Sequence, residues 1–220
     1  MENNNQELNK YDHLLPEDRF NLAYEEYVKT ENNDYQKIIN LLDDKKVCQF
    51  AQSDDKKKNL YYNALLFSLF AVERYDDVIN KAQKAPETAY ILSIIGNSHF
   101  FKKDFSSAIN YLTEESVLKE YENIPVHIRN IALSFYYLKK FPDAIKYFEK
   151  ESFKKSSRDY FLLGICYYKI EDYENASRIL TEKIDKNEYI NDLDYLKTLG
   201  TCYFNLCEYT KAIKKQSEKI

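Results

Sequence analysis

The segment L-G-I-C-Y-Y-K-I-E-D-Y-E-N-A, residues 163–176, carries a pattern that occurs twice more in the chain. The other copies are I-G-N-S-H-F-F-K-K-D-F-S-S-A at 95–108 and L-G-T-C-Y-F-N-L-C-E-Y-T-K-A at 199–212. In each copy glycine follows a branched apolar residue, an aromatic stands nine residues later, and alanine comes three residues after that. Glycine inside a helix costs about 1 kcal/mol relative to alanine. Because all three glycines of the chain lie at this one position, we expect two helices to approach closely there.

The aromatic residue of this pattern recurs along the chain at a nearly regular interval. It stands at Tyr35, Tyr75, Phe105, Phe141, Tyr173 and Tyr209. The intervals are 40, 30, 36, 32 and 36 residues. A period near 34 residues, built from helix–turn–helix units, is typical of tetratricopeptide repeats. The chain resembles that family over residues 59–220, with a degenerate unit before them.

The unit that begins at Ser157 matches the family pattern best. Its matching residues are Tyr160, Leu163, Gly164, Tyr167, Tyr173, Ala176 and Leu180. The other units begin at Asn59, Ala89, Pro125 and Leu193. The Asn59 unit is weaker because Leu66 and Val78 fill positions that are small in the family. Around Tyr35 only a second helix, Tyr35–Leu42, fits. The resemblance implies an all-α, right-handed superhelical solenoid of about five to six helix pairs.

We expect one solenoid over residues 16–220, because a single repeat cannot bury its apolar face alone. Residues 1–15 are polar and are expected to be flexible. Residues 45–58 are expected to form an extended insertion between the first two units, with a short helix around Val47–Gln52. The last helix, Tyr209–Ile220, has no polar capping helix after it. Either the chain belongs to a longer protein, or this helix faces another subunit.

Composition narrows the kinds of partner and compartment. The net charge is −4, with 36 acidic and 32 basic side chains, so nucleic acid is not an expected partner. The first ten residues, MENNNQELNK, do not form a secretory signal, and the apolar stretch Tyr61–Val72 is too short to span a bilayer. Cys48, Cys166, Cys202 and Cys207 are too sparse for a disulfide scaffold. We therefore expect a reducing compartment, the cytoplasm or alternatively the nucleus, and no membrane.

The sequence gives little support for catalysis, a metal or a cofactor. Three glycines at distant positions cannot form a phosphate-binding loop. The histidines His13, His99 and His127 lie in different units, and Cys202 and Cys207 have no second cysteine pair at ligand spacing. His99 takes the place of a core aromatic, so a packing role is favoured over that of a catalytic base. We expect no enzyme activity.

The resemblance also implies a binding surface. In the family, the second, fifth, sixth, ninth, twelfth and thirteenth positions of each first helix face a concave groove. The twelfth position is aromatic in every unit: Phe70, Phe100, Tyr136, Tyr168 and Phe204. The expected peptide-binding groove comprises Tyr90, Asn97, Phe100, Arg129, Asn130, Leu133, Tyr136, Tyr137, Arg158, Phe161, Tyr168, Thr201 and Phe204. Alternatively, the rings only pack between adjacent units.

The function favoured by these features is a non-enzymatic scaffold that holds a peptide or helix of a partner protein in the groove. A first alternative is a co-chaperone-like adaptor that captures a terminal carboxylate. Asn97, Asn130 and Arg158 match three of the five positions of the family's carboxylate clamp, whereas Ser93 and Leu162 replace the other two. A second alternative is a self-associating arm of a multiprotein complex, with a homodimer as its simplest form.

Overall fold

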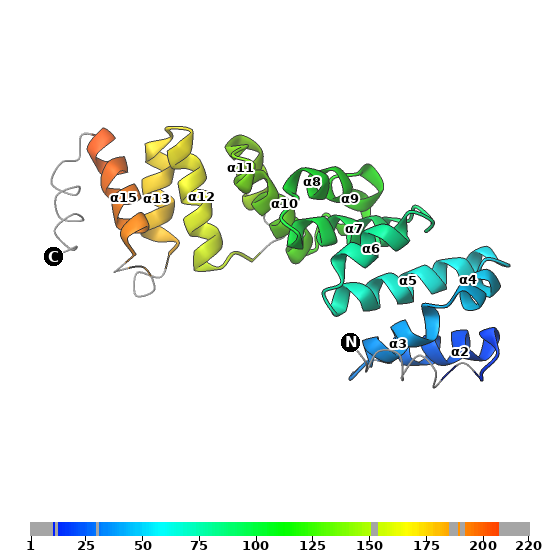
Figure 1. The fold of residues 1–220 in the computed structure, drawn as a ribbon. Coiled ribbons are helices and arrows are strands. Elements are labelled where there is room, and N and C mark those ends of the chain that lie inside the picture. The colour runs from blue at the N-terminus through cyan, green and yellow to red at the C-terminus, as the bar shows by residue number, and fades with distance from the viewer. Residues whose placement is uncertain are drawn as a thin grey trace. The chain divides into compact units, whose positions relative to one another are not determined.

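The computed structural model describes residues 11, 13–29, 31–150, 154–184, 189 and 192–206. Helices make up 75% of the structure, and the described residues contain no strand, which confirms the all-α prediction (Figure 1). The chain forms two compact units, residues 1–120 and 121–220, and each is described separately below. The single solenoid over residues 16–220 remains a prediction.

The 1–120 unit contains three antiparallel helix pairs and two short additional helices. The pairs are α2 (Pro16–Tyr27) with α3 (Tyr35–Leu42), α5 (Asp55–Ala71) with α6 (Tyr75–Ala82), and α7 (Ala89–Phe101) with α8 (Phe105–Leu112). The additional helices are α4 (Lys45–Ala51), between the first two pairs, and α9 (Glu115–Tyr121), which reaches the boundary of the unit.

The 121–220 unit contains two pairs and one further first helix. Its described helices are α10 (Pro125–Tyr137), α11 (Phe141–Phe148), α12 (Ser157–Lys169), α13 (Tyr173–Glu182) and α15 (Leu193–Asn205). Successive pairs are in contact, α11 with α12 and α13 with α15. The helix expected over Tyr209–Ile220 lies outside the described residues, as does most of the N-terminal segment 1–15.

Four of the five predicted repeat starts are confirmed, the exception being Asn59. Four first helices begin at the predicted unit starts, Ala89, Pro125, Ser157 and Leu193, and each is 13 residues long. All described second helices begin at the recurring aromatic residue. Local chemistry explains several of these starts. Ser156 and Asp159 form a capping box, the side chain of Asp192 accepts a hydrogen bond from a backbone N–H of the first turn, and Pro125 occupies the first turn, where proline is tolerated.

The turn inside each pair also has a fixed geometry. Glu73, Lys103, Lys139 and Glu171 each stand two residues before the recurring aromatic and have positive φ angles of 59–64°. The residue after each of them donates its N–H to the carbonyl five residues earlier, for example Lys140 N to Phe135 O at 2.9 Å. This is the Schellman termination of a helix. It ends α5, α7, α10 and α12 at the same distance from the helix that follows, whereas the longer connection between α2 and α3 differs.

Residues 45–58 differ from the predicted extended insertion. Most of them are helical, because α4 covers Lys45–Ala51 and α5 starts at Asp55, four residues before the predicted unit start. Two aspartates stabilise these helix starts. Asp44 accepts hydrogen bonds from the N–H groups of Lys46 and Val47, and Asp54 accepts one from Lys57 N. The short helix predicted around Val47–Gln52 therefore exists, shifted by one or two residues.

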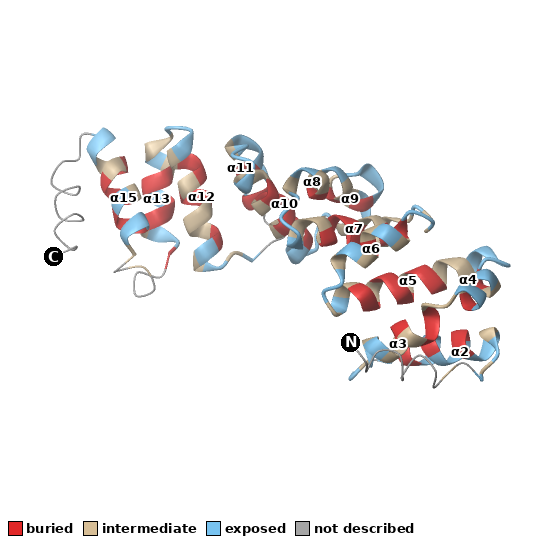
Figure 2. Cartoon of the chain, viewed as in Figure 1, coloured by how far each residue is buried: buried red, intermediate tan, exposed pale blue. Residues whose placement is uncertain are grey.

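Buried residues line the inward faces of the helices (Figure 2). In the weaker unit, Leu66 and Val78 are fully buried at positions where the family has small residues. In the other pairs the small residues are retained, and Ala108, Ala132, Ala144 and Ala176 are each 0% exposed. The core thus continues through each unit as a series of interhelical contacts.

Gly96 and Gly164 lie where the two helices of their pairs are in close contact, as predicted, whereas the helix expected to cross at Gly200 lies outside the described residues. A Cβ atom added to Gly96 would lie 2.7 Å from Cδ2 of Leu112, and one added to Gly164 would lie 2.6 Å from Cδ2 of Leu180. Both distances are shorter than carbon atoms in contact allow. Neither glycine has a positive φ, so the requirement comes from packing and not from the backbone.

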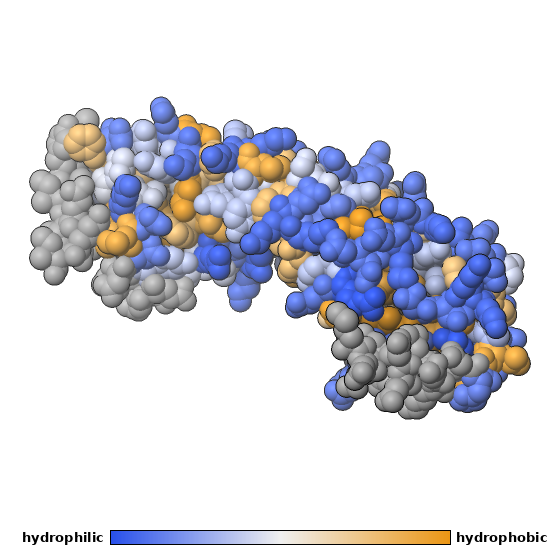
Figure 3. Space-filling model, in the orientation of Figure 1, coloured by the Kyte–Doolittle hydropathy of each residue, from blue (hydrophilic) through white to orange (hydrophobic). Residues whose placement is uncertain are grey.

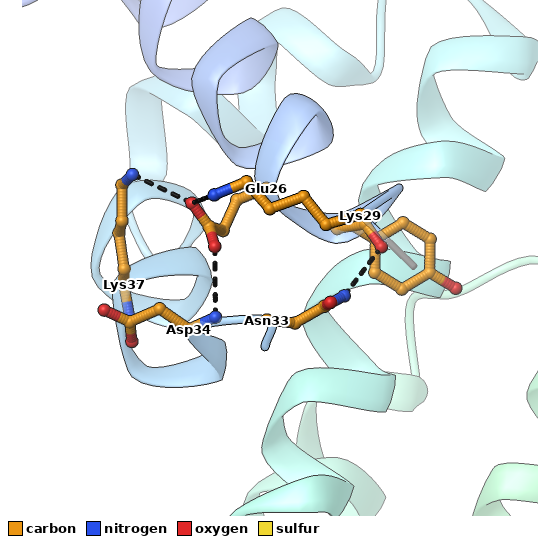
Figure 4. A network of polar contacts seen from close by, with 6 residues as sticks. Glu26, Lys29, Asn33, Asp34 and Lys37 are labelled. Atoms are coloured by element: carbon orange, nitrogen blue, oxygen red, sulfur yellow. Dashed lines mark hydrogen bonds and ion pairs between the residues drawn. The ribbon is translucent and has the colours of Figure 1, made fainter. Parts of the chain in front are cut away.

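A buried carboxylate joins the first two helices of the chain (Figure 4). The Glu26 carboxylate, 4% exposed, accepts hydrogen bonds from Lys29 Nζ at 2.6 Å, Lys37 Nζ at 2.9 Å and Asp34 N at 3.1 Å. These donors, led by Lys29, lower the pKa of Glu26 from 4.5 to about 2, although burial acts in the opposite direction. The carboxylate therefore fixes the end of α2 to the loop and to α3.

Replacing Gly164 with valine should lower the free energy of unfolding by about 1–3 kcal/mol, the usual cost of overpacking. The matched control is Gly164→Ala, which adds only Cβ and gains about 1 kcal/mol of helix propensity, so it should remain nearer to wild type. Thermal unfolding followed by circular dichroism measures both. An unchanged midpoint for Gly164→Val would show that the crossing of α12 and α13 is not tight.

Glu26→Gln should make the stability of the fold depend less on pH. The folded pKa of Glu26 lies below its ordinary value, so ionised Glu26 stabilises the fold above pH 4.5, and this contribution is lost as the pH falls from 4.5 towards about 2. We expect the variant to melt below wild type at neutral pH, and the gap to close in acid. The control is Glu25→Gln at the exposed neighbouring position. A gap that is independent of pH would contradict this role for the carboxylate.

Candidate functional site

The predicted groove residues all lie on first helices of the repeat, but they are divided between the two units. The 1–120 unit contains Tyr90, Asn97 and Phe100, all on α7. The 121–220 unit contains Arg129, Asn130, Leu133, Tyr136 and Tyr137 on α10, Arg158, Phe161 and Tyr168 on α12, and Thr201 and Phe204 on α15. A continuous groove through both units remains a prediction.

The α7 residues are engaged within their own unit. The hydroxyl of Tyr90 lies 3.0 Å from that of Tyr27 on α2, so this pair connects helices of different repeats. Asn97 Nδ2 donates a hydrogen bond to Ser93 O one turn earlier, at 2.8 Å. These contacts give Tyr90 and Asn97 structural roles in addition to any part in binding.

The rings at the twelfth position pack against the recurring aromatic of the same pair. The centroid distances are 5.5 Å for Phe70–Tyr75, 5.9 Å for Phe100–Phe105, 6.2 Å for Tyr136–Phe141 and 6.1 Å for Tyr168–Tyr173. Each contact spans the turn between the two helices. The four twelfth-position rings are partly buried, so their first role is to hold the turn.

Tyr136 also lies close to the pairs that follow its own. Burial raises the pKa of its phenol, and the proximity of Cys166 on α12 and Asp194 on α15 adds to that shift. Tyr136 therefore lies partly between its own repeat and the repeats that follow, as the packing alternative expects. Its truncation would disturb the fold as well as any binding surface.

A bidentate ion pair connects α10 with α12. Arg129 Nε and Nη2 donate to Asp159 Oδ1 and Oδ2 at 3.1 and 2.8 Å. The Asp159 carboxylate is buried, and it also accepts hydrogen bonds from Ser156 Oγ and Ser156 N, both at 2.8 Å. Arg129 is therefore already engaged in a structural ion pair. Arg158, which precedes Asp159 on α12, is exposed. Asn130 is only 6% exposed, which also limits what it can offer a ligand.

The remaining groove residues differ in exposure. Leu133 is partly buried, and Phe161 packs against the rings of Tyr189 and Tyr195 at 5.1 and 6.2 Å. Thr201 Oγ1 donates a hydrogen bond to Lys197 O at 2.8 Å, inside its own helix. The two ring contacts of Phe161 and the hydrogen bond of Thr201 are all made within the chain itself, without a partner protein.

The exposed rings identify a narrower surface than the predicted groove. Among the described residues, the aromatic side chains that are at least 36% exposed are Tyr24, Phe101, Tyr137 and Phe204. Three of them lie in the last turn of a first helix: Phe101 is 50% exposed, Tyr137 48% and Phe204 60%. We call these three residues the exposed ring set. On the face shown in Figure 3, hydrophobic patches interrupt a hydrophilic surface.

Phe101 was missed in the predicted groove, although the signal was present. It occupies the thirteenth position of its unit, as Tyr137 does in the next unit, and that position faces the groove in the family. Its ring stacks on Tyr75 at 5.4 Å and meets Phe70 edge-on at 5.7 Å. Half of Phe101 nevertheless remains accessible to solvent.

The other side chains considered for chemistry are occupied in packing. His99 stacks on Tyr111 and lies 3.0 Å from a carboxylate oxygen of Asp104. Burial raises the pKa of the Cys166 and Cys202 thiols to about 12, so both are poor nucleophiles. Within the described ranges, histidine, cysteine and acidic side chains do not gather in a group that could hold a metal ion. Nor does any described helix combine the length and apolar character needed to cross a bilayer.

The fold is similar to that of a tetratricopeptide repeat protein from Parabacteroides merdae. The TM-score is 0.56 at 16% identity, and the match covers 91% of this chain and 77% of the other. A second similar structure is BtubC (BKLC) from P. vanneervenii, with a TM-score of 0.44 at 15% identity, over 94% of this chain and 90% of the other. No protein-family model and no curated protein matches the sequence. The likeness to the Parabacteroides merdae protein concerns the helical repeat fold.

The Arg129–Asp159 pair should appear as an energetic coupling between α10 and α12. We expect Asp159→Ala to cost about 1–3 kcal/mol, because the variant loses both the capping box and the ion pair. Arg129→Ala should cost less. The double variant should cost about 0.5–1.5 kcal/mol less than the sum of the single variants. Urea unfolding measures the cycle, with Arg158→Ala as an exposed control that should change little. Strict additivity would mean that the pair does not stabilise the fold.

Proposed function

We propose that this chain is a member of the tetratricopeptide repeat family and a non-enzymatic protein-interaction module. Its first helices would bind a segment of a partner protein. The observation that carries the proposal is the exposed ring set, with Phe101 in the last turn of α7 in the 1–120 unit, and Tyr137 and Phe204 in the last turns of α10 and α15 in the 121–220 unit. The shared helical repeat fold supports the same proposal, because such folds commonly present an extended binding face.

Exposed aromatic residues suit this function for a physical reason. A large ring offers much contact area and loses little conformational freedom when it is buried by a partner. Energetically dominant interface residues are accordingly rich in tyrosine and tryptophan. The most suitable partner is a peptide or helix that presents apolar side chains to the rings. Arg158, exposed in the first turn of α12, is a cation that could also contact such a partner.

The carboxylate-clamp alternative depends mainly on Arg158. Arg129 is paired with Asp159, and Asn130 is nearly buried, so neither offers an open donor to a ligand carboxylate in this arrangement. A clamp of this kind would bind a chain terminus through one arginine. Its ligand would lose affinity strongly on Arg158→Ala and only weakly on removal of an exposed ring.

The cellular setting is part of the proposal. Cys166 and Cys202 are buried free thiols and Cys48 is a partly buried one, which supports a reducing compartment such as the cytoplasm. A self-associating arm is the remaining alternative. Sedimentation of the whole chain distinguishes the two, since a scaffold for another protein sediments as a monomer without that protein.

The test removes exposed rings one at a time, and Tyr137→Ala complements Phe101→Ala, which also removes ring contacts with Phe70 and Tyr75. We expect Phe101→Ala and Tyr137→Ala to weaken capture of a native partner by about 2 kcal/mol each, roughly thirtyfold in Kd. Quantitative pull-down from the native cells, with wild type and variants side by side, identifies partners that are lost with these rings. The matched control is Tyr24→Ala, which removes an exposed ring outside the set. Circular dichroism confirms that helicity is retained.

Each outcome of this test has a distinct meaning. Partners lost with the exposed rings and kept by Tyr24→Ala support the proposed face. Loss with Arg158→Ala alone supports the carboxylate clamp instead. Partners that bind all variants equally would refute the first-helix face as the binding site.

A further inference from the structure

A pocket in the 1–120 unit has no residue of the exposed ring set in its lining. It has a volume of about 340 Å³ and is bordered by α4, α5, α6 and the end of α3. Small-molecule sites in proteins typically have volumes of about 300–1,000 Å³ and combine apolar walls with a few polar groups. The residues of this pocket follow that composition, as described below.

One side of the pocket is aromatic and apolar. Tyr61, Tyr62 and Leu65 line it, and all three are buried in α5. The two tyrosine rings are nearly perpendicular, at 88°, with centroids 5.1 Å apart. The Tyr61 hydroxyl donates to Leu42 O at 3.2 Å, so its polar end is satisfied inside the protein. Burial raises the pKa of Tyr62, and the nearby Cys48 thiol adds to the shift, so this phenol stays neutral.

The rim of the pocket carries three lysines, Lys45, Lys81 and Lys84. Lys81 is neutralised by Asp43, with Nζ 2.6 Å from the carboxylate. The second carboxylate at the rim, Asp44, pairs with Arg19 at 3.4 Å and also caps α4. Both carboxylates of the pocket thus have their own cations.

Lys45 and Lys84 remain as uncompensated positive charges. Among the described residues, no carboxylate lies within ion-pair distance of either ammonium group. The surrounding unit is acidic, since residues 1–120 contain 21 acidic and 15 basic side chains. Two unpaired lysines beside an aromatic wall are therefore a local feature and not a general property of the surface.

We propose that this pocket binds a small organic anion with a planar apolar body, the chemistry of an aryl phosphate. The planar body would lie on Tyr61, Tyr62 and Leu65, because aromatic rings offer stacking and edge contacts to a flat ligand. The phosphate would lie between Lys45 and Lys84, since lysine binds phosphate as a mobile point charge. This site is independent of the proposed protein-binding face.

Phenyl phosphate is the probe that tests both halves of the pocket. Titration into ¹⁵N-labelled protein should shift amide signals of α4, α5 and α6. Inorganic phosphate lacks the ring and phenol lacks the charge. The Kd of each should therefore be at least roughly tenfold higher than that of phenyl phosphate. Equal binding of inorganic phosphate and phenyl phosphate would overturn the proposal, because it would reduce the site to ion pairing with lysine. Absence of any shift with phenyl phosphate would overturn it as well.

Two variants locate the bound anion. The double variant Lys45→Gln, Lys84→Gln keeps two exposed polar side chains and should weaken phenyl phosphate binding roughly tenfold or more. Lys46→Gln, at the adjacent exposed position outside the pocket lining, is the matched control and should bind like wild type. Binding should also weaken as salt is added. Equal affinity of the double variant and wild type would show that the anion binds elsewhere and would overturn the assignment.

Discussion

The close crossing of the two helices in each pair is the constraint on which the rest of the structure depends. At Gly96 and Gly164 an added Cβ would press on the side chains of Leu112 and Leu180, so even a methyl group requires those leucines to shift. In the pair α10–α11, Ala132 takes the place of glycine and is fully buried. A fixed crossing determines which face of each first helix points away from its partner. The surface available to other molecules is therefore decided by this contact.

The turn inside each pair transmits this geometry along the chain. Non-glycine residues such as Lys103 and Lys139 adopt the left-handed conformation there, at a cost of about 1–2 kcal/mol each. The Schellman hydrogen bonds and the rings packed across the turn offset that cost. The twelfth-position aromatics thus belong to the fold first. The thirteenth-position rings Phe101 and Tyr137 are more exposed than the twelfth-position rings Phe100 and Tyr136 that precede them.

The sequence predicted the periodic part of the fold closely, because periodicity reflects contacts that recur in every pair. The starts of α7, α10, α12 and α15 followed from the repeat alone. It did not predict α9, and it placed α4 inside an extended insertion, because helices of 7 residues carry too little periodic signal. Asp44 and Asp54 as caps were the available local signals.

The candidate site was harder to predict, because its key pairings join residues far apart in the chain. Arg129 and Asp159 are 30 residues apart, and Tyr27 and Tyr90 are 63 apart. No periodic rule states that one of the groove residues, Arg129, is already occupied by a carboxylate of the next pair. Position in the repeat indicates the direction of a side chain. Only the three-dimensional contacts show which side chains are already engaged within the protein and which remain accessible to a ligand.

The two surfaces identified in this chain arise from opposite features of its sequence. The exposed ring set follows the repeat, since each of its rings lies in the last turn of a first helix. The pocket with Lys45 and Lys84 comes from a departure from the repeat, because α4 is an additional helix that borders it. Repetition favours an extended ligand that contacts several pairs in the same way. An additional helix creates an open pocket at one place in the chain, which would suit a small ligand better than a long one.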